Sequence, residues 1–536
     1  MKKIFIASIY LVLGTTGLLL TSCRSTDTES NLVSGAPTAV NFNLTGTEFS
    51  GGTATAQASV EGKGVAFTEA SVQKQTVMVD PSTVIVAELS PVSGSIKSST
   101  QASVGKAALA AVPGNALGAG IQFRVIAYNQ ADGSFQAFQD YTVGQQAVPM
   151  MLNVGATYTM VVYSYGTMTL PAITSGEKTS INNAQVNYDD ANRDFMYYNQ
   201  SNYIPVKGSN VLNITLRHKV AQITTIINSN GMGNIASVAN AVLTPHYSNG
   251  TIPLSSGVMT GRSTLTAGVP LQFSNTSPTT SVAAPVFINA DTGGNKTGSF
   301  SADISLGSTT VTKNLANTFK ITPGYKSNLT INIEKCGAMV NGVWRTFMCH
   351  NLGAEIAADP FTPAAAIHGA KYQWGAQTGE AGRYVSQTDD QSMTSVSGWN
   401  TTMNTDNSLW GDTTKGPNDP CPSGFRLPAQ TEWAAVINEN TGARVGNWVF
   451  NVTTYGSAYY FSSASRPNSL MLPAAGYRPD GLILSRGKEA NYWSGTTLDG
   501  INSKRLSITG FTVTADTNFN GQPRTDGLSV RCISVN

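Results

Sequence analysis

Tryptophan and cysteine are confined almost entirely to the last third of this 536-residue chain. All seven tryptophans lie beyond Glu334, and so do four of the five cysteines. A single continuous fold would spread its largest side chains and its cross-links over its whole length. The sequence therefore predicts a separate C-terminal domain over residues 334–536, with an aromatic core and the disulfide bonds that exported proteins form.

The first 333 residues carry the alternating pattern of β-sandwiches. Val40, Phe42 and Leu44 alternate with polar residues, as a half-buried strand requires. Charged residues make up 12% of the chain, against about 25% in an ordinary soluble protein, and small polar residues are plentiful. Both features favour strands joined by many turns. Further strands of the first block are expected over residues 75–79, 83–88, 121–128, 135–143 and 158–165.

A second block of strands begins near Asp194. Its clearest stretch is residues 211–228, where apolar and polar residues alternate up to Lys219 and resume after it. Later strands are expected over residues 237–243, 281–288, 299–306 and 326–333. We therefore predict a mostly β chain, with tandem β-sandwich domains over residues 24–193 and 194–333 ahead of the C-terminal domain.

The N-terminus reads as a targeting segment. Lys2 and Lys3 precede an apolar run over residues 4–20, which ends in the letters LLTSC at Cys23. This ending resembles a bacterial lipobox, and it predicts a signal peptide over residues 1–23 and a fatty acyl anchor such as palmitate on Cys23. A secretory signal with an incidental cysteine is the alternative. The small polar residues from Arg24 to about Pro37 are typical of a flexible tether.

Four motifs of the C-terminal domain carry a family resemblance. In order they are PCPSGFRLPAQTEW ending at Trp433, AAGYRPDG ending at Gly481, NYWSGT ending at Thr496 and SVRC ending at Cys532. Together they resemble the Fibrobacter succinogenes major paralogous domain, a branch of the C-type-lectin-like fold related to formylglycine-generating enzymes. The resemblance implies a compact α+β domain of binding type. Residues 429–439 contain no helix breaker and predict a helix with Trp433 in the core.

Three motifs of the preceding region resemble the fimbrillin-type pilins of the type V pilus. They are YTMVVYSYGT beginning at Tyr158, DFMYY beginning at Asp194 and LRHKVAQITTII beginning at Leu216. This resemblance implies a cell-surface fimbria whose subunits carry two β-sandwich domains. It also implies a lipid-anchored precursor at the outer membrane and assembly with other fimbrial subunits.

Assembly in that family implies donor-strand exchange, in which proteolysis removes the first strand and a neighbouring subunit supplies a replacement. The first basic residues beyond the strand at residues 39–44 are Lys63 and Lys74, and these are the candidate processing sites. Stalk subunits supply the donor strand from their C-terminus, but only residues 533–536 follow Cys532 here. We therefore expect a subunit that accepts a strand and does not donate one, which predicts a place at the filament tip.

The four cysteines of the C-terminal domain allow three disulfide pairings. Cys336 and Cys349 flank an Asn-Gly turn signal, so a hairpin would bring them together, and the preferred pairs are Cys336–Cys349 and Cys421–Cys532. A two-residue turn would place Cys336 opposite Phe347, with Cys349 on the diagonal, whereas a four-residue loop would align the two cysteines. Metal ligation is the competing interpretation, and the absence of a C-x2-C pair argues against it.

Residues 371–412 form a long loop-rich stretch with four candidate ligand-binding aromatics, Tyr372, Trp374, Trp399 and Trp410. Exposed aromatic rings stack on the apolar faces of sugars, and long irregular segments are often functional. The alternative is that these rings fill the core. Arg478 and Asp480 are expected to form an arginine-anchored turn.

A calcium-bridged sugar site is doubtful, because the EPN, QPD and WND motifs of calcium-dependent lectins of this fold are missing. Asp389, Asp390, Asp412 and Asp419 could bind calcium, although solvated loop charge is the simpler interpretation. We therefore expect no cofactor and no metal site, with calcium possible but unsupported.

Several function classes are excluded. The formal net charge is +2 with no long basic run, which removes nucleic acid as a partner. No Gly-x-Ser-x-Gly, HExxH or P-loop motif is present, and the cysteines are assigned to disulfides, so no enzyme is expected. We predict a non-enzymatic fimbrial tip subunit or adhesin whose C-terminal domain binds a host or microbial glycan or protein. The alternative is an anchored surface lipoprotein that binds glycans for nutrient capture.

Overall fold

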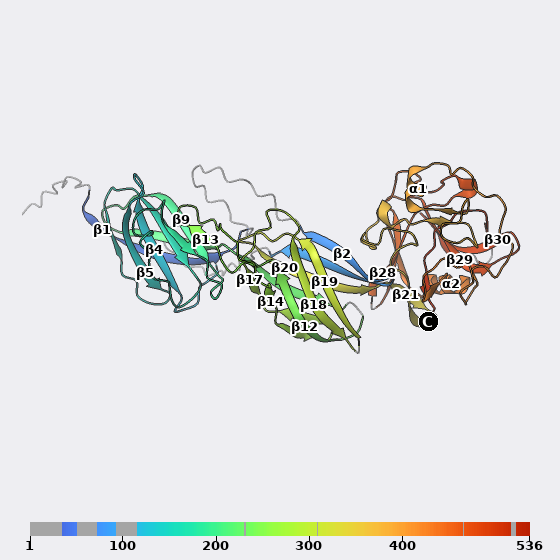
Figure 1. The fold of residues 1–536 in the computed structure, drawn as a ribbon, viewed down its shortest axis with the longest axis horizontal. Coiled ribbons are helices and arrows are strands. Elements are labelled where there is room, and N and C mark those ends of the chain that lie inside the picture. Colours follow the sequence, from blue (N-terminus) through green and yellow to red (C-terminus); the bar gives the residue numbers. More distant parts are fainter. Residues whose placement is uncertain are drawn as a thin grey trace, which may run out of the picture.

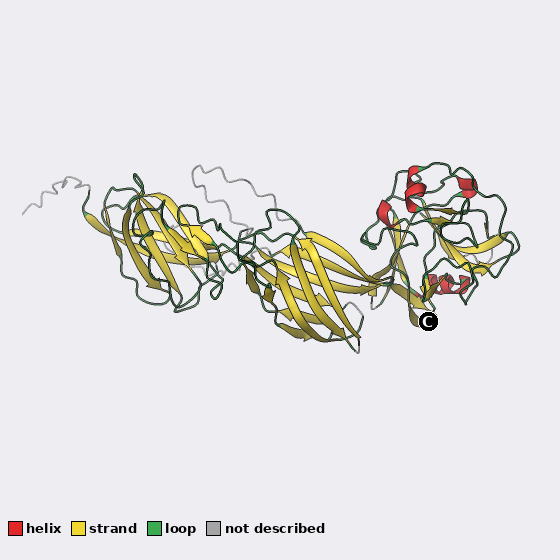
Figure 2. Cartoon of the chain, in the orientation of Figure 1, coloured by secondary structure: helices red, strands yellow, loops and turns green. Residues whose placement is uncertain are grey.

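The computed structural model describes residues 35–50, 72–92, 115–229, 232–307, 309–464, 466–515 and 521–535. Within these residues the chain forms three lobes in a row, as Figure 1 shows. The first two are built from strands, and the third combines strands with short helices (Figure 2). The chain is therefore mostly β, as predicted. Cys23 and Lys63 lie outside the described residues.

The first lobe is built on one strongly curved sheet of seven strands. In spatial order these are β5 (Phe135–Thr142), β4 (Gln122–Asn129), β7 (Tyr158–Ser164), β9 (Met196–Tyr203), β10 (Asn210–His218), β1 (Pro37–Glu48) and β6 (Met150–Asn153). One face buries Val40, Val125 and Ile214 in a core. The other face buries Tyr163 and Phe195 together with residues of the small sheet formed by β8 (Gln185–Asn187) and β13 (Thr251–Pro253).

The second lobe is a sandwich of two sheets around one core. The larger sheet has the order β15 (Phe273–Ser277), β16 (Thr280–Ala283), β11 (Ala221–Asn228), β20 (Lys326–Lys335), β3 (Thr83–Pro91) and β2 (Gln73–Asp80), with β17 (Val286–Ile288) also paired to β11. The smaller sheet has the order β14 (Val269–Pro270), β12 (Ile235–Thr244), β18 (Gly298–Leu306) and β19 (Thr309–Phe319). Ile85, Ile223 and Ile331 of the larger sheet pack against Leu243 and Phe300 of the smaller one.

The lobes do not divide at residue 193 as the sequence analysis expected. Strands β9 and β10 follow that residue but belong to the first sheet, whereas β2 and β3 precede it and belong to the second lobe. The reason is that the chain crosses between the lobes: β3 pairs antiparallel with β20, from Pro91 opposite Ser327 to Thr83 opposite Lys335, and β1 pairs parallel with β10. Such long-range pairing leaves no local signal in the sequence.

The third lobe contains short strands in several small sheets and two α-helices, α1 (Gln387–Ser392) and α2 (Gln430–Glu439), with 3-10 turns at Ala365–Ile367 and Pro479–Gly481. The strands are β21 (Gly337–Val340), β22 (Val343–Thr346), β23 (Lys371–Tyr372), β24 (Tyr384–Val385), β25 (Phe425–Arg426), β26 (Thr441–Val445), β27 (Ala458–Ser463), β28 (Arg466–Pro473), β29 (Glu489–Thr497), β30 (Asn502–Thr509), β31 (Val513–Ala515), β32 (Gln522–Pro523) and β33 (Ile533–Ser534). All of them pair within this lobe.

Helix α2 begins within one residue of the helix predicted over residues 429–439. The carboxylate of Glu432 accepts the backbone N–H of Ala429 at 2.8 Å and receives two hydrogen bonds from Arg426, at 2.8 and 2.7 Å. An acid in the first turn also suits the helix dipole. Trp433 is fully buried against β29 and β30, as predicted. In the part of the chain that the structure describes, no helix has both the length and the apolar character needed to cross a membrane.

Candidate functional site

Strand β1 occupies the position that the sequence analysis assigned to a replaceable strand. It pairs parallel with β10 over eight residue pairs, from Val40 opposite Asn210 to Glu48 opposite Arg217. On its other side it pairs antiparallel with β6, but only over residues 37–40. Thr47 also forms an isolated antiparallel bridge with Asn115, through backbone hydrogen bonds of 2.8 and 2.9 Å. Among the described residues, residues 41–46 of β1 therefore have a strand partner on one side alone.

Apolar side chains at alternate positions fix β1 to the first lobe. Val40 is fully buried, and Phe42 and Leu44 are half-buried against the same core. The Phe42 ring meets the edge of Tyr141 with centroids 5.4 Å apart. Thr45 donates its hydroxyl to the carbonyl oxygen of Ile214 at 2.8 Å. Together these contacts match the pattern of a strand that inserts alternate side chains into a groove.

A groove runs beside the half of β1 that β6 does not cover. It has a volume of about 390 Å³ and lies between β1 and the end of β5, with Phe42, Leu44, Phe123, Tyr141 and Val148 among its lining residues. Cavities of this size are within the range of small-molecule and peptide side-chain sites. Among the residues that the structure describes, the first sheet therefore closes incompletely next to β1.

The end of β1 reaches the second lobe. Phe49 stacks on His218 with ring centroids 3.8 Å apart, and His218 lies close to Phe287 of the second lobe at 6.1 Å. Ser50 donates its backbone N–H to the carbonyl oxygen of Gly324 at 2.7 Å. The strand therefore contributes to the joint between the first two lobes as well as to the first sheet.

The two candidate processing sites differ in their surroundings. Lys63 lies outside the described residues, in the connection between β1 and β2. Lys74 lies inside β2 opposite Glu88, and its ammonium group forms an ion pair with Asp359 at 2.8 Å. A protease must bind its substrate in an extended, unpaired conformation, so cutting at Lys74 requires β2 to leave its sheet first.

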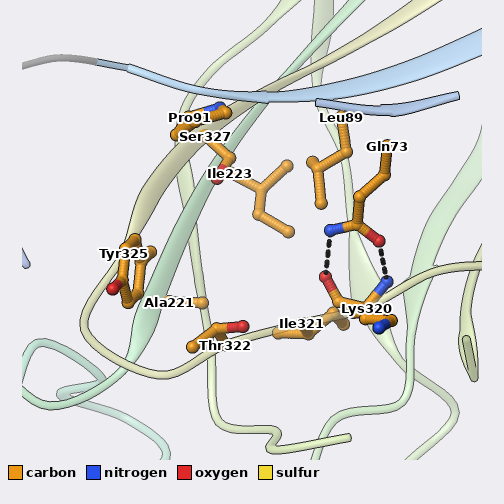
Figure 3. A pocket seen from close by; sticks show the side chains of 10 residues that line it. All are labelled: Gln73, Leu89, Pro91, Ala221, Ile223, Lys320, Ile321, Thr322, Tyr325 and Ser327. Atoms are coloured by element: carbon orange, nitrogen blue, oxygen red, sulfur yellow. Dashed lines mark hydrogen bonds between the residues drawn. The ribbon is translucent and has the colours of Figure 1, made fainter. Parts of the chain in front are cut away.

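Figure 3 shows a second restraint at the start of β2. The side-chain amide of Gln73 donates to the carbonyl oxygen of Lys320 at 3.2 Å and accepts the backbone N–H of the same residue at 2.7 Å. The pocket beneath this pair has a volume of about 30 Å³, which is room for about one water molecule. It is too small to bind a ligand, and the contact serves to hold β2 in place.

The last described residues are held inside the third lobe. Cys532 and Ile533 are fully buried, and Ile533 pairs with Arg426 of β25. Val535 donates its backbone N–H to the carbonyl oxygen of Gly424 at 3.0 Å. In Figure 1 the C-terminal end lies next to β21, on the side of the third lobe that faces the second lobe.

The structure forms both preferred disulfides. The Cα atoms are 5.2 Å apart in Cys336–Cys349 and 5.9 Å apart in Cys421–Cys532. The hairpin between β21 and β22 has the two-residue turn, because Val340 pairs with Val343 and Asn341 has φ of 53°. Phe347 donates its N–H to the carbonyl oxygen of Cys336 at 2.9 Å, so Cys349 lies on the diagonal.

Three of the four predicted ligand-binding aromatics are in the core, and the prediction for them was wrong. Tyr372 and Trp374 are fully buried, Trp410 is 1% exposed, and all three belong to one cluster with Trp493. Their polar atoms are used internally, as in the hydrogen bond from Trp374 Nε1 to the carbonyl oxygen of Ser494 at 3.1 Å. Buried rings cannot stack on a sugar.

Trp399 is the fourth aromatic, and it is half-buried. Its Nε1 donates to the carbonyl oxygen of Thr525 at 3.0 Å, and its ring packs against Gly527 and Gly481. It therefore braces two turns. Among the described residues of this lobe, the most exposed aromatic rings are instead Phe450 and Phe511, on loops that the sequence analysis did not select. No periodic pattern or neighbouring motif distinguished them.

The four candidate calcium ligands are used in structural contacts at separate places. The carboxylate of Asp419 accepts the N–H groups of Cys421 and Leu427, that of Asp412 accepts the hydroxyl of Thr496, and that of Asp389 accepts the hydroxyl of Ser386. Asp390 is fully buried between two arginines. Among the described residues, no group of three or more His, Cys, Asp or Glu side chains is placed to hold a metal ion.

The charge network around Asp390 was not foreseen from the sequence. Arg478 and Arg486 bond its carboxylate at 2.6 and 2.9 Å, and Lys371 lies 3.8 Å away. Burial alone would raise the pKa of Asp390, but these three cations outweigh it and hold the pKa below its usual range. Burial lowers the pKa of Lys371 to about 8. Arg478 also donates to the carbonyl oxygen of Gly481, which is the predicted arginine-anchored turn.

The motif arginines of the third lobe are structural. Arg531 is buried and donates to the carbonyl oxygens of Met348, Cys349 and Met471 and to Asn351. Burial lowers its pKa to about 10. Such residues join distant loops in a domain with little regular secondary structure, and none of them faces an open site.

No protein-family model and no curated protein matches the chain. Solved structures with a partial likeness include a candidate cell adhesion protein of Bacteroides uniformis (14% identity, 41% of this chain, 92% of that one, TM-score 0.29). Two further structures are from Porphyromonas gingivalis. The fimbrial anchor protein Mfa2 has 10% identity over 43% of this chain and 92% of that one, with a TM-score of 0.27. The tip fimbrial protein Mfa3, truncated at its C-terminus, has 10% identity over 40% of this chain and 92% of that one, with a TM-score of 0.27. At these TM-scores the likeness identifies neither fold nor function, and function has to be inferred from the residues.

Proposed function

We propose that this chain is a non-enzymatic subunit of a cell-surface fimbria that accepts a strand from a neighbouring subunit in the place of β1. The third lobe serves as the binding head, which suits a position at the filament tip. The chain reaches the surface as a precursor anchored to the outer membrane through a lipid on Cys23, and proteolysis then releases it from that anchor.

The observation that carries the proposal is the isolation of β1 within the topology. It precedes every other described strand, and the next one, β2, belongs to another lobe. One cut at Lys63 would therefore release β1 without interrupting any other described strand. The loss of β1 would leave the whole edge of β10 unpaired, together with the buried surface that Val40 covers. An incoming extended segment would restore both kinds of contact.

The third lobe supports the role of acceptor. The stretch from Cys532 to Val535 is fixed by a disulfide, by pairing with β25 and by burial of Ile533. This stretch cannot leave the lobe to complete a neighbour's sheet unless the lobe opens. The last described strand, β33, is therefore fixed within the head, which supports a subunit that receives a strand through its first lobe.

Peptide rebinding tests the proposal. The chain is cut at Lys63, β1 is removed in mild denaturant, and a synthetic peptide of residues 37–50 is added after refolding. We expect the peptide to bind and to raise the unfolding temperature of the cut chain. A control peptide with serine in place of Val40, Phe42 and Leu44 should bind at least tenfold more weakly.

Failure of the native peptide to bind would contradict strand acceptance, and so would equal binding of the two peptides. The cell fraction from which the protein is recovered distinguishes the fimbrial function from the alternative one. A full-length chain found only in outer-membrane fractions, and never in sheared filaments, would favour an anchored glycan-binding lipoprotein.

A further inference from the structure

An exposed aromatic patch lies on the third lobe, away from the buried rings described above. We define it by Trp448, Val449, Phe450 and Phe511. Phe511 is 96% exposed at the turn between β30 and β31, Val449 and Phe450 are about half exposed, and Trp448 is half-buried. A side chain built on Gly510 would meet Trp448 at 3.5 Å, so the two loops are in contact. A patch of this kind marks an interaction site more often than a random surface does.

Arg444 holds the two loops of the patch together. Its Nε donates to the carbonyl oxygen of Thr509 at 2.8 Å and its Nη2 donates to that of Thr512 at 3.2 Å. The guanidinium lies 5.8 Å from the ring centre of Trp448 and 5.3 Å from that of Tyr459. These contacts fix its position, while the residue remains exposed. Among the described residues Nη1 of Arg444 has no hydrogen-bond partner.

Arg444 is the charged side chain in contact with the patch, and the carboxylate of Glu489 lies across the strand pair from Thr509, bonded to Ser485 and Asn491. No Asp or Glu occurs between residues 440 and 479 or between residues 500 and 515, the two stretches that form the patch. No described carboxylate forms a salt bridge with Arg444, and the exposed Lys488 follows Gly487, which contacts the carbonyl oxygen of Val449. An occupant that carries a negative charge is therefore favoured over a neutral one.

The polar groups between the rings are already satisfied. The hydroxyls of Thr509 and Thr512 bond each other at 2.9 Å, and Asn451 accepts the N–H and hydroxyl of Thr453. What the patch offers a ligand is thus a set of ring faces next to a fixed guanidinium. Ring faces suit the C–H faces of a sugar, and a guanidinium suits a carboxylate. A membrane or an apolar peptide would use the rings and leave Arg444 without a partner.

We propose that the aromatic patch and Arg444 form a binding site for glycans that end in a carboxylated sugar. The inference rests on the proposed role of the third lobe as a binding head and names its ligand class. The sheet of β29 and β30, from which the Phe511 turn extends, lies in the half of the third lobe remote from the second lobe (Figure 1).

The full chain is titrated with 3′-sialyllactose, trigalacturonic acid, lactose and 3′-sulfolactose in isothermal calorimetry. We expect both carboxylated sugars to bind at least tenfold more tightly than lactose and more tightly than the sulfated sugar. Raising the salt from 50 to 500 mM should weaken their binding, because the site is exposed to solvent.

Three variants locate the site. F511S and R444Q should each lose at least tenfold in affinity for sialyllactose, while K296Q, which alters an exposed lysine of the second lobe, should change nothing. R444Q removes two loop contacts, so F511S is the cleaner test, because its side chain is almost fully in solvent. R444K keeps the positive charge but lacks the planar guanidinium that can donate two hydrogen bonds to one carboxylate, so it should bind sialyllactose with intermediate affinity.

Equal affinity for lactose, preference for the sulfated sugar, or unchanged binding in F511S would overturn the inference. Capture of anionic vesicles or of an apolar peptide with no sugar binding would overturn it as well. Recovery of the F511S chain in sheared filaments would show that the substitution affects sugar binding and not filament assembly. A wild-type chain that enters filaments but binds no acidic sugar would refute the ligand class and leave the fimbrial role standing.

Discussion

Cys336 donates its backbone N–H to the carbonyl oxygen of Ser82 at 2.8 Å, across the boundary between the second and third lobes. It is the only residue between the end of β20 and the start of β21. Its disulfide partner Cys349 bonds the carbonyl oxygen of Pro81 in the same way, and Val84 and Val86 pack on the pair. The tip of the β2–β3 hairpin therefore braces the head directly, without a linker.

The two disulfides should differ in their effect on stability. The Cys421–Cys532 bond closes a loop of 111 residues and the Cys336–Cys349 bond one of 13 residues. The loop-entropy relation gives about 4 to 5 kcal/mol for the first and about 3 kcal/mol for the second. We expect C421S/C532S to lower the free energy of unfolding of the third lobe more than C336S/C349S. Urea unfolding followed by tryptophan fluorescence reports this lobe, because it holds all the tryptophans.

The same cysteine variants test the contact between the β2–β3 hairpin and the third lobe. C336S/C349S should loosen the contact with the β2–β3 hairpin and increase amide hydrogen exchange at Ser82 and Val84, whereas C421S/C532S should not. Equal exchange at the hairpin in both variants would show that the disulfide does not support the junction.

The attachment of β1 should depend on its apolar residues and not on its surface charge. L44D places a carboxylate in the core beneath β1 and should increase amide exchange along β10 by at least tenfold. E48Q removes only the ion pair with Arg217, which is largely exposed and contributes little. We expect exchange in E48Q to stay within twofold of the wild type. If the two variants behave alike, burial does not hold the strand.

Stability should fall as the pH rises through the titration of Asp526. Burial raises the pKa of this carboxyl to about 6, with Asp480 adding to the rise, against about 3.9 in an unfolded chain. Between these values the folded protein keeps a proton that the unfolded chain has lost, so folding is weakened by about 2 to 3 kcal/mol above pH 6. D526N should remove this loss and unfold at a higher urea concentration at pH 7.5 than the wild type, but not at pH 4.

The matched control is E355Q, at an exposed position of the same lobe. It should leave the difference in stability between pH 4 and pH 7.5 unchanged. A wild-type protein whose third lobe becomes more stable from pH 4 to 6, with D526N following it, would contradict the assignment.

Arg531 should be among the most sensitive positions of the head. R531M removes donors from three carbonyl oxygens and Asn351 in a fully buried place, which costs about 3 kcal/mol or more. R345M removes a single hydrogen bond to the carbonyl oxygen of Ser534 near the surface and should cost about 1 kcal/mol. Equal losses in urea unfolding would show that burial of Arg531 is unimportant.

Local patterns in the sequence predicted the features that depend on local structure. The alternation of Val40, Phe42 and Leu44 located β1, the Asn341-Gly342 turn located a hairpin, and the entrance of α2 was placed within one residue. The disulfides followed from that hairpin and from the family motifs. In each case the signal and the structure lie within a short stretch of chain.

Features that depend on distant partners were not predictable. The boundary at residue 193 failed because β2 and β3 leave the first block to pair with β20. The prediction that aromatic residues of residues 371–412 contact a ligand also failed. The amino-acid composition of a loop does not show whether its rings pack around a buried residue such as Trp493 or face the solvent. Phe511 is the opposite case, an exposed ring that the sequence did not indicate. Its neighbours Gly510 and Thr512 give no sign that the ring lies in solvent.

The N-terminal sequence of this chain in sheared, washed filaments tests the central claim most directly. We predict a mature protein that begins at Gly64, after a cut at Lys63 that removes β1 and leaves the Gln73 and Lys74 contacts of β2 in place. A filament-bound chain that begins before Ala39, with β1 still attached, would contradict strand replacement.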